Sequence, residues 1–165
     1  MNKDFVKICF RLASADWHGS STETLWAEPL VGTEDAKAFK IENSPFYAKG
    51  ISYLDVVRAV KRNGQYEFAG VIAHSGHSTY RLLVDPGVTT FEAWWKKLQD
   101  LGCTYESGTF EEKKLFTVDV PPTADIYVAY DILEKAEKQD VWLFEEAHVG
   151  HKLKDQRLGK APGLS

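Results

Sequence analysis

The hydrophobic pattern of this chain changes near residue 78, and this change limits the folds that the chain can adopt. Before it, apolar and polar residues alternate in short runs; in VKICFRL, for example, Val6, Ile8 and Phe10 fall on one face, as in a half-buried strand. After it, strand patterns alternate with longer segments in which apolar residues recur every three or four positions, which is typical of helices. The sequence therefore predicts an α+β protein with two parts.

A β-hairpin is the clearest local signal in the first part. Asn63-Gly64 separates strand patterns over residues 54–61 and 65–73, and Asn-Gly supplies the two positive φ angles of a type I′ turn. The strands are short and the turns are tight, and closing such a sheet is the usual way to leave no exposed edge. We therefore expect an N-terminal curled antiparallel β-sheet or small barrel over residues 1–77.

In the second part the expected order is strand, helix, strand, strand, helix, strand. The first helix follows Thr89, which forms a capping-box pattern with Glu92, and the second helix follows Thr123 as its N-cap. This βαββαβ order is typical of a ferredoxin-like unit, which we assign to residues 78–151. Residues 152–165 lack an apolar face, and we expect them to form a flexible tail.

The two parts are expected to pack against each other. Trp26 belongs to the first part, and Trp94 and Trp95 belong to the first helix of the second part. Because a large aromatic side chain gains much free energy from burial, we expect these tryptophans to lie at the shared interface.

Composition limits the function classes. The 165 residues include 20 basic and 24 acidic side chains, for a formal net charge of −4, so no overall positive field favours nucleic acid as a partner. Cys9 and Cys103 lack the spacing of a zinc site, and no apolar run has the length of a membrane span. We therefore expect a cytoplasmic protein with free thiols, no cofactor and no membrane association.

Six segments of the chain carry a family resemblance. They are VKICFRL, ETLWAEPL, IENSPFYAKGISYLDVVRA, SGHSTYRLL, FTVDVPPTADI and VWLFEEAHVGH, in this order, between residues 5 and 151. Together they resemble a bacterial family, the domain of unknown function 4265, which implies a compact bacterial protein and supplies neither catalytic residues nor a cofactor. The second part is also similar, at the level of the fold, to ferredoxin-like regulators that inhibit ribonucleases through protein contact.

The stretch HSGHSTYRLLV, residues 74–84, gathers polar groups that are typical of a site. A nucleophilic serine needs a base within hydrogen-bond reach, and Ser75 or Ser78 could pair with His77 or His74. Neighbouring residues of an extended chain point to opposite faces, however, and the G-x-S-x-G elbow is absent from the sequence. Three interpretations stay open: a polar turn, a ligand-contact site and a nucleophilic site.

A second candidate is FEEAHVGH, residues 144–151. On a regular strand Glu146 and His148 would share one face, and Glu145 would lie on the other. His148 and His151 do not have the HExxH order that places two histidines one helical turn apart. We therefore expect no metal site here, and we interpret the acidic pair as surface charge or as a set of ligand contacts.

Two smaller patterns have two interpretations each. Phe46 and Tyr47 lie in a proline-driven bend, where aromatic rings either anchor a partner or fold back into the core. Arg58, Lys61 and Arg62 lie near a hairpin tip and form either a solvated charged surface or a contact for RNA.

The leading expectation is a non-enzymatic binding or regulatory protein that acts through contacts with another protein, for example as an immunity or inhibitor protein. The first alternative is a small hydrolase with a His/Ser site around His77 and an acid from Glu145 or Glu146, and the second is an RNA-binding module. No catalytic residue is assigned. The residues expected to contact the partner or ligand are Phe46, Tyr47, Ser75, His77, Ser78, Tyr80, Arg81, Glu145, Glu146 and His148.

Overall fold

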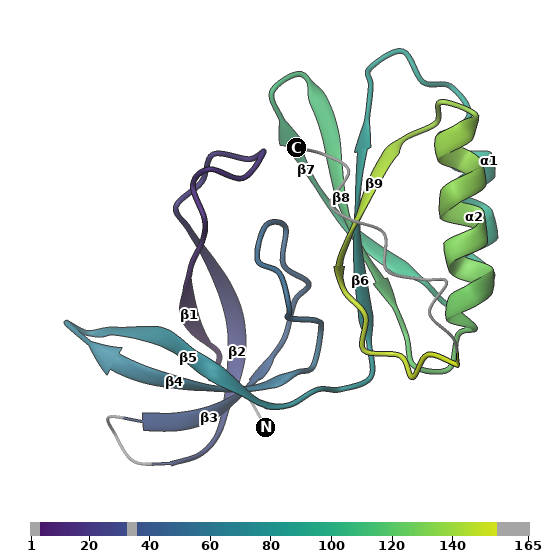
Figure 1. The fold of residues 1–165 in the computed structure, drawn as a ribbon. Helices are drawn as coiled ribbons and strands as arrows, with labels where there is room; N and C mark the ends of the chain where they lie inside the picture. Colours follow the sequence, from purple (N-terminus) through teal and green to yellow (C-terminus); the bar gives the residue numbers. More distant parts are fainter. Residues whose placement is uncertain (1–3, 33–35, 155–165) are drawn as a thin grey trace.

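The computed structural model describes residues 4–32 and 36–154 of the chain (Figure 1). Residues 155–165, most of the segment expected to form a flexible tail, lie outside the described residues. The elements are β1 (Val6–Arg11), β2 (Thr22–Gly32), β3 (Ala36–Ile41), β4 (Val56–Arg62), β5 (Gln65–Ala73), β6 (Ser78–Val84), α1 (Phe91–Gln99), β7 (Thr104–Phe110), β8 (Lys113–Val120), α2 (Ile126–Lys138) and β9 (Leu143–His148).

Strands β1 to β5 form a closed barrel, as predicted. The hairpin between β4 and β5 turns at Asn63 and Gly64, whose φ angles are 51° and 76°, because a type I′ turn requires both angles to be positive. The alternating pattern of β1 is confirmed, since Ile8 and Phe10 are buried inside the barrel. The ring closes through a short parallel pairing of β1 with β5, in which Ile8 lies opposite Tyr66.

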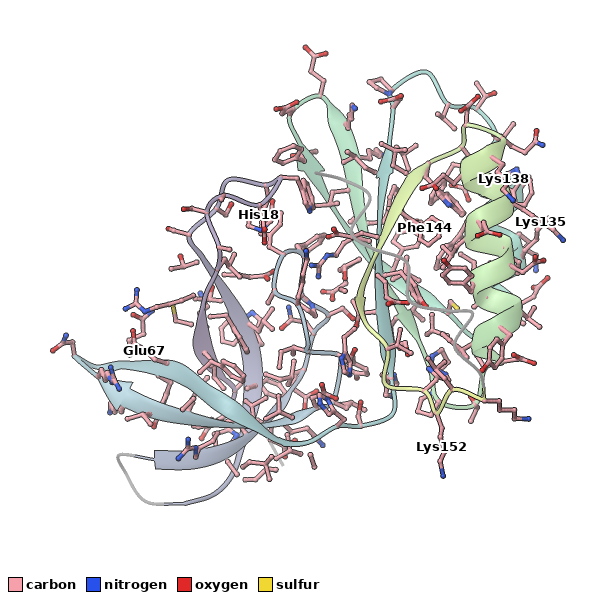
Figure 2. All side chains as sticks on the ribbon, in the orientation of Figure 1. His18, Glu67, Lys135, Lys138, Phe144 and Lys152 are labelled. Carbon is pink, nitrogen blue, oxygen red and sulfur yellow. The ribbon has the colours of Figure 1, made fainter. Side chains whose placement is uncertain are left out.

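Strands β6 to β9 form a four-stranded antiparallel sheet in the order β7-β8-β6-β9. Helices α1 and α2 cover one face of this sheet, and the barrel lies on its other face (Figure 1). Phe144 lies between the sheet and α2, whereas Lys135 and Lys138 project from the outer side of α2 (Figure 2). Neither described helix has the length and apolar character needed to cross a membrane.

Both helices begin later than the sequence predicts. The capping box of Thr89 and Glu92 is wrong, because Thr90 is the N-cap of α1 and makes no side-chain cap bond. Thr123 is also wrong as a cap, because Asp125 precedes α2 and accepts hydrogen bonds from the amides of the two residues that follow Ile126. A carboxylate satisfies these free amides and also interacts favourably with the positive end of the helix dipole.

The three tryptophans expected at the interface between barrel and sheet lie elsewhere. Trp26 lies on the outside of the barrel and is 48% exposed, whereas Trp95 is buried in the core between helices and sheet and Trp94 packs against that core. Side chains alternate along a strand, so Leu82 of β6 and Phe116 of β8 face the helices. Polar residues of these strands, such as Arg81 and Thr117, face the barrel instead.

Candidate functional site

A buried arginine joins the sheet to the barrel. Arg81 of β6 is fully buried, and its guanidinium donates to the carbonyls of Pro45 (3.1 Å), Ala48 (2.8 Å) and Tyr47 (2.8 Å) in the connection between β3 and β4. Its Nε donates to Oε1 of Glu145 at 3.1 Å. Burial lowers the pKa of Arg81, and the Glu145 carboxylate opposes that shift. The three carbonyl contacts of this guanidinium therefore hold the two parts together, and Glu145 of the neighbouring strand of the sheet balances its charge.

The same connection is held from the opposite side by a carboxylate of the barrel. Glu23 of β2 accepts hydrogen bonds from the amides of Phe46 (2.6 Å), Tyr47 (3.0 Å) and Ala48 (2.8 Å). We call this segment, residues 45–48 between Glu23 and Arg81, the clamped loop. Its amides face an anion and its carbonyls face a cation, so its backbone charge distribution is matched on both sides.

The clamped loop orients the two aromatic candidates. Tyr47 lies against His18, with ring centroids 4.7 Å apart, and at an edge of Trp17. Phe46 packs over Gly108 of β7, where an added Cβ would lie 3.6 Å from its ring. Both candidate rings are half-buried between barrel and sheet.

Two polar atoms close to this loop lack partners. The carboxylate of Glu145 accepts from Trp17 and Arg81 through Oε1, while its Oε2 is buried without a hydrogen bond among the described residues. His18 lies in the connection between β1 and β2 (Figure 2), and its Nε2 is also buried without a hydrogen bond among the described residues. Because Nδ1 of His18 accepts from the amide of Ser20, Nε2 carries the proton in the neutral ring.

His77 has a fixed acid, which the sequence did not identify. Its Nδ1 lies 2.8 Å and 3.0 Å from the two carboxylate oxygens of Asp119, at the end of β8. The ring edge meets Tyr53, with centroids 5.3 Å apart. Burial raises the pKa of Asp119, and the nearby His77 and His151 oppose that shift. The carboxylate–imidazole arrangement is that of a histidine oriented for acid–base work.

The serines near His77 serve the backbone. The Ser75 hydroxyl donates to the carbonyl of Tyr53 at 2.7 Å and accepts from the amide of His77 at 3.2 Å. Ser78 is fully buried, and its oxygen accepts from the amides of Gly150 and His151. In the described part of the chain, neither hydroxyl bonds to Nε2 of His77.

Ser78 and His151 form a hydrogen-bonded pair in which the serine hydroxyl donates to the histidine. Nε2 of His151 lies 2.9 Å from the carbonyl of Pro121 and must donate to it, so Nδ1 is the acceptor for the Ser78 hydroxyl at 2.6 Å. With both nitrogens used and the serine buried, this pair holds the segment that follows β9 against β6 and the end of β8. The pair is a structural contact.

Glu146 and His148 do not share a face. The pairing of β6 with β9 shifts between Thr79 and Tyr80, so Glu146 lies opposite Tyr80 and His148 opposite Thr79. Tyr80 donates to Glu146 at 3.4 Å, and burial raises the pKa of both groups. The expected sharing is therefore wrong, because a β-bulge turns the strand between the two residues.

His148 instead reaches the barrel. Its ring stacks on His74, with centroids 4.4 Å apart, and Nδ1 of His74 lies 3.0 Å from Oδ2 of the fully buried Asp55. Asp55 also accepts from the amides of Ser52 (2.9 Å) and Ser75 (2.8 Å). Burial lowers the pKa of His148, and His74 lowers it further.

A cleft of about 370 Å³ opens between barrel and sheet beside these contacts. The amide of Ser44 donates to Glu106 in one wall at 3.0 Å. Tyr53 and Asp119 connect the cleft to His77. The lining residues are Glu42, Asn43, Ser44, Tyr53, Thr104, Tyr105, Glu106, Thr117 and Asp119.

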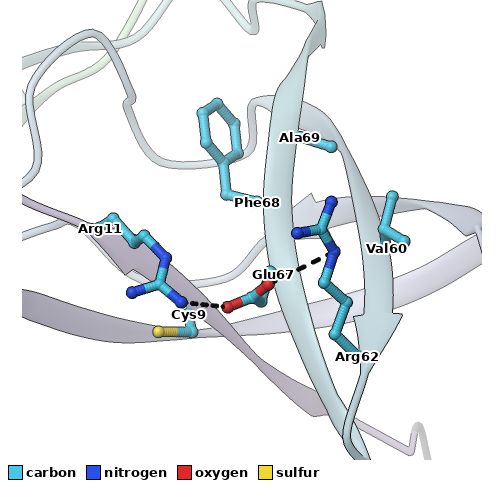
Figure 3. A pocket seen from close by; sticks show the side chains of 7 residues that line it. All are labelled: Cys9, Arg11, Val60, Arg62, Glu67, Phe68 and Ala69. Carbon is cyan, nitrogen blue, oxygen red and sulfur yellow. Dashed lines mark hydrogen bonds and ion pairs between the residues drawn. The ribbon is translucent and has the colours of Figure 1, made fainter.

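The basic patch at the hairpin tip is partly neutralised. Glu67 of β5 pairs with Arg11 at 2.8 Å and with Arg62 at 3.6 Å, across a pocket of about 290 Å³ (Figure 3). Arg58 donates to the carbonyl of Ala69 at 3.0 Å. The negative charge of Glu67 offsets one positive charge of this basic cluster, which weakens the positive potential that would attract RNA phosphates.

The likeness of this chain to known proteins concerns its fold and its family. No curated protein matches this chain. A solved structure, "Novel crystal structure of a hypothetical protein from Neisseria gonorrhoeae", is similar with a TM-score of 0.65 at 16% sequence identity, over 92% of this chain and 99% of that one; this likeness shows the fold alone. The family model of the domain of unknown function DUF4265 matches residues 23–144, more than half of the chain, so the chain belongs to the DUF4265 family.

Proposed function

We propose that this protein acts by binding another protein, and that it does so through an apolar surface on the outside of the barrel. We call this surface, Phe5 and Trp26, the barrel patch. The two side chains are 45% and 48% exposed, and they line a groove together with Glu42. The exposed tryptophan is the observation that carries the proposal, since tryptophan is enriched among the residues that dominate binding energy at interfaces.

The surroundings of Trp26 suit contact through side chains. The barrel is closed, so its strands offer no free edge for a partner strand. Lys7 lies over the Trp26 ring at 4.9 Å, and an ion pair joins Glu28 of the same strand to Lys40 of the neighbouring β3. An apolar centre with a charged rim is the usual anatomy of a protein interface. We therefore commit to a partner that presents an aliphatic or aromatic side chain to this groove.

The polar candidate residues support the same proposal, because they make their hydrogen bonds within the protein. Arg81, Glu145 and the clamped loop bond to one another, and Ser75 and Ser78 bond to backbone groups. Neutralising a toxin or nuclease, the specific role expected from the acidic charge and small size, would be one form of such binding. The identity of the captured partner decides that point.

The first prediction concerns Trp26. Trp26→Ser should weaken capture of the native partner by at least about 30-fold, as expected for loss of roughly 2 kcal/mol at a central contact. Affinity capture from the native host followed by a binding titration with the purified partner measures this. Ile72→Ser is the matched control, because Ile72 is a 56% exposed apolar residue at the end of β5. Equal binding by the two variants, or capture of no partner by the unchanged protein, contradicts the proposal.

A second candidate function is acid–base hydrolysis, favoured by the contact of Asp119 with His77. In this mechanism Asp119 orients the ring, and the remaining nitrogen of His77 takes a proton from water. His77→Gln should then lower hydrolysis of a responsive ester or phosphodiester by about 10²- to 10⁴-fold, while Ser75→Ala should stay within tenfold. Hydrolysis that is absent from the unchanged protein, or equal in His77→Gln, removes this candidate.

We also propose a ferredoxin-like classification for the second part and a cytoplasmic location. The sheet order β7-β8-β6-β9, with α1 after β6 and α2 after β8, supports the classification. Two free, buried cysteines, Cys9 and Cys103, are compatible with a reducing compartment. Cell fractionation tests the location directly.

A further inference from the structure

We propose that Asp55, His74 and His148 form a binding site for a divalent transition-metal ion, independently of the proposed protein binding. One ligand atom from each of these residues lies within 4.8 Å of the other two. Asp55 lies just before β4, His74 just after β5, and His148 ends β9. The site thus brings together two segments of the barrel and one of the sheet.

The donor set determines the kind of ion. Two imidazole nitrogens and one carboxylate oxygen suit zinc or ferrous iron, with open positions left for water or another ligand. Calcium and magnesium prefer oxygen ligands. The site therefore favours a first-row transition ion over the hard alkaline-earth ions.

A buried nitrogen without a partner provides independent evidence. Nε2 of His148 is buried and has no hydrogen bond among the described residues. An unsatisfied buried polar atom costs about 1–3 kcal/mol. A metal ion would use the lone pair of such a nitrogen, and the neighbouring His74 and Asp55 supply the other ligands.

The carboxylate is already positioned for this role. The amide of Ser75 donates to Oδ1 of Asp55 at 2.8 Å, and the amide of Ser52 donates to Oδ2 at 2.9 Å. Hydrogen bonds of this kind orient metal-ligating carboxylates. Asp55 is fully buried, so it is a fixed ligand rather than a mobile surface charge.

His74 can complete the geometry. Ligands about 2.0–2.2 Å from a zinc ion are about 3–3.5 Å from one another. Nδ1 of His74 and Oδ2 of Asp55 already have this spacing at 3.0 Å, and because all three donors lie within 4.8 Å of one another, the remaining approach is at most about 1–2 Å. The His74 side chain is 45% exposed, which leaves it free to turn from its bond with Asp55 toward a shared ion. Its exposed side also provides the entry path.

The experiment uses the full chain, stripped of metal with a chelator, and Zn²⁺ and Co²⁺ as probes. We expect one Zn²⁺ per chain by calorimetry, visible d–d absorption on addition of Co²⁺, and a higher melting temperature with Zn²⁺, because an ion that binds only the folded state stabilises it. His74→Ala and His148→Ala should each weaken binding at least about tenfold. His77→Gln is the matched histidine control and should bind as the unchanged protein does.

Asp55→Asn is less suitable as a first variant, because Asp55 also holds two amides and its loss threatens folding. His74→Ala avoids this difficulty, and circular dichroism checks the fold of each variant. Absence of Zn²⁺ binding by the unchanged protein overturns the proposal. So does a His148→Ala variant that binds as tightly as the unchanged protein, since that outcome assigns the ion to exposed His74 alone.

Discussion

At the scale of single residues, the structure uses its buried charges to join two parts of one chain. Arg81 and Glu145 are both fully buried, and Arg81 alone contacts three carbonyls of the connection between β3 and β4. A buried ion pair is strongly destabilising when only one partner is removed, because the other charge stays buried and unpaired. Arg81 is therefore a residue on which folding depends.

Arg81→Met should lower the free energy of unfolding by about 3–5 kcal/mol. Urea unfolding followed by tryptophan fluorescence measures it. The matched control is Arg62→Met, whose side chain is 71% exposed and which should change stability by less than about 0.5 kcal/mol. Equal midpoints for the two variants would show that the clamped loop is held by other contacts.

Residue roles were only partly predictable from the sequence. The alternation of apolar residues identifies the buried face of β1, because a strand has a period of two whatever its partners are. Asp119 could not be identified as the acid of His77, because the antiparallel register that pairs Thr79 with Asp119 joins residues far apart in the chain. Asp55 and Glu23 were missed for the same reason.

At the scale of elements, β9 shows where local pattern fails. A register shift between Thr79 and Tyr80 of β6 directs Glu146 toward Tyr80 and His148 toward the barrel. Strict alternation cannot reveal a β-bulge, which depends on the partner strand. The helix starts failed similarly: Thr123 and Asp125 are both good N-caps in sequence, and only the packed structure selects Asp125.

The position of Glu146 predicts a pH effect. Burial raises the pKa of Glu146 in the folded protein, so the folded state binds a proton more tightly than the unfolded state does. Stability then falls as pH rises through this pKa, and the penalty is absent below the ordinary glutamate range. Glu146→Gln should raise the urea midpoint at neutral pH and leave it unchanged at acidic pH. A lower midpoint at neutral pH would contradict this assignment.

At the scale of the whole molecule, the barrel and the sheet meet through buried polar groups together with a few aromatic contacts, such as Trp17 with Phe110. The tryptophans expected there lie elsewhere, since Trp95 of α1 is buried in the core between helices and sheet and Trp26 is exposed on the barrel. Composition and alternation predicted a barrel and an α+β arrangement, but they could not predict which faces meet. This arrangement leaves the barrel patch as an apolar surface whose exposure folding does not explain.

The most direct test of this account is site-specific photo-crosslinking in the native host. A photoreactive phenylalanine analogue replaces Phe5 in the barrel patch or, as the matched control, Tyr105 in the cleft between barrel and sheet; the two side chains are 45% and 39% exposed. The account predicts one defined protein adduct from position 5 and none from position 105. An adduct from position 105 alone, or from neither position, would contradict binding through the barrel patch.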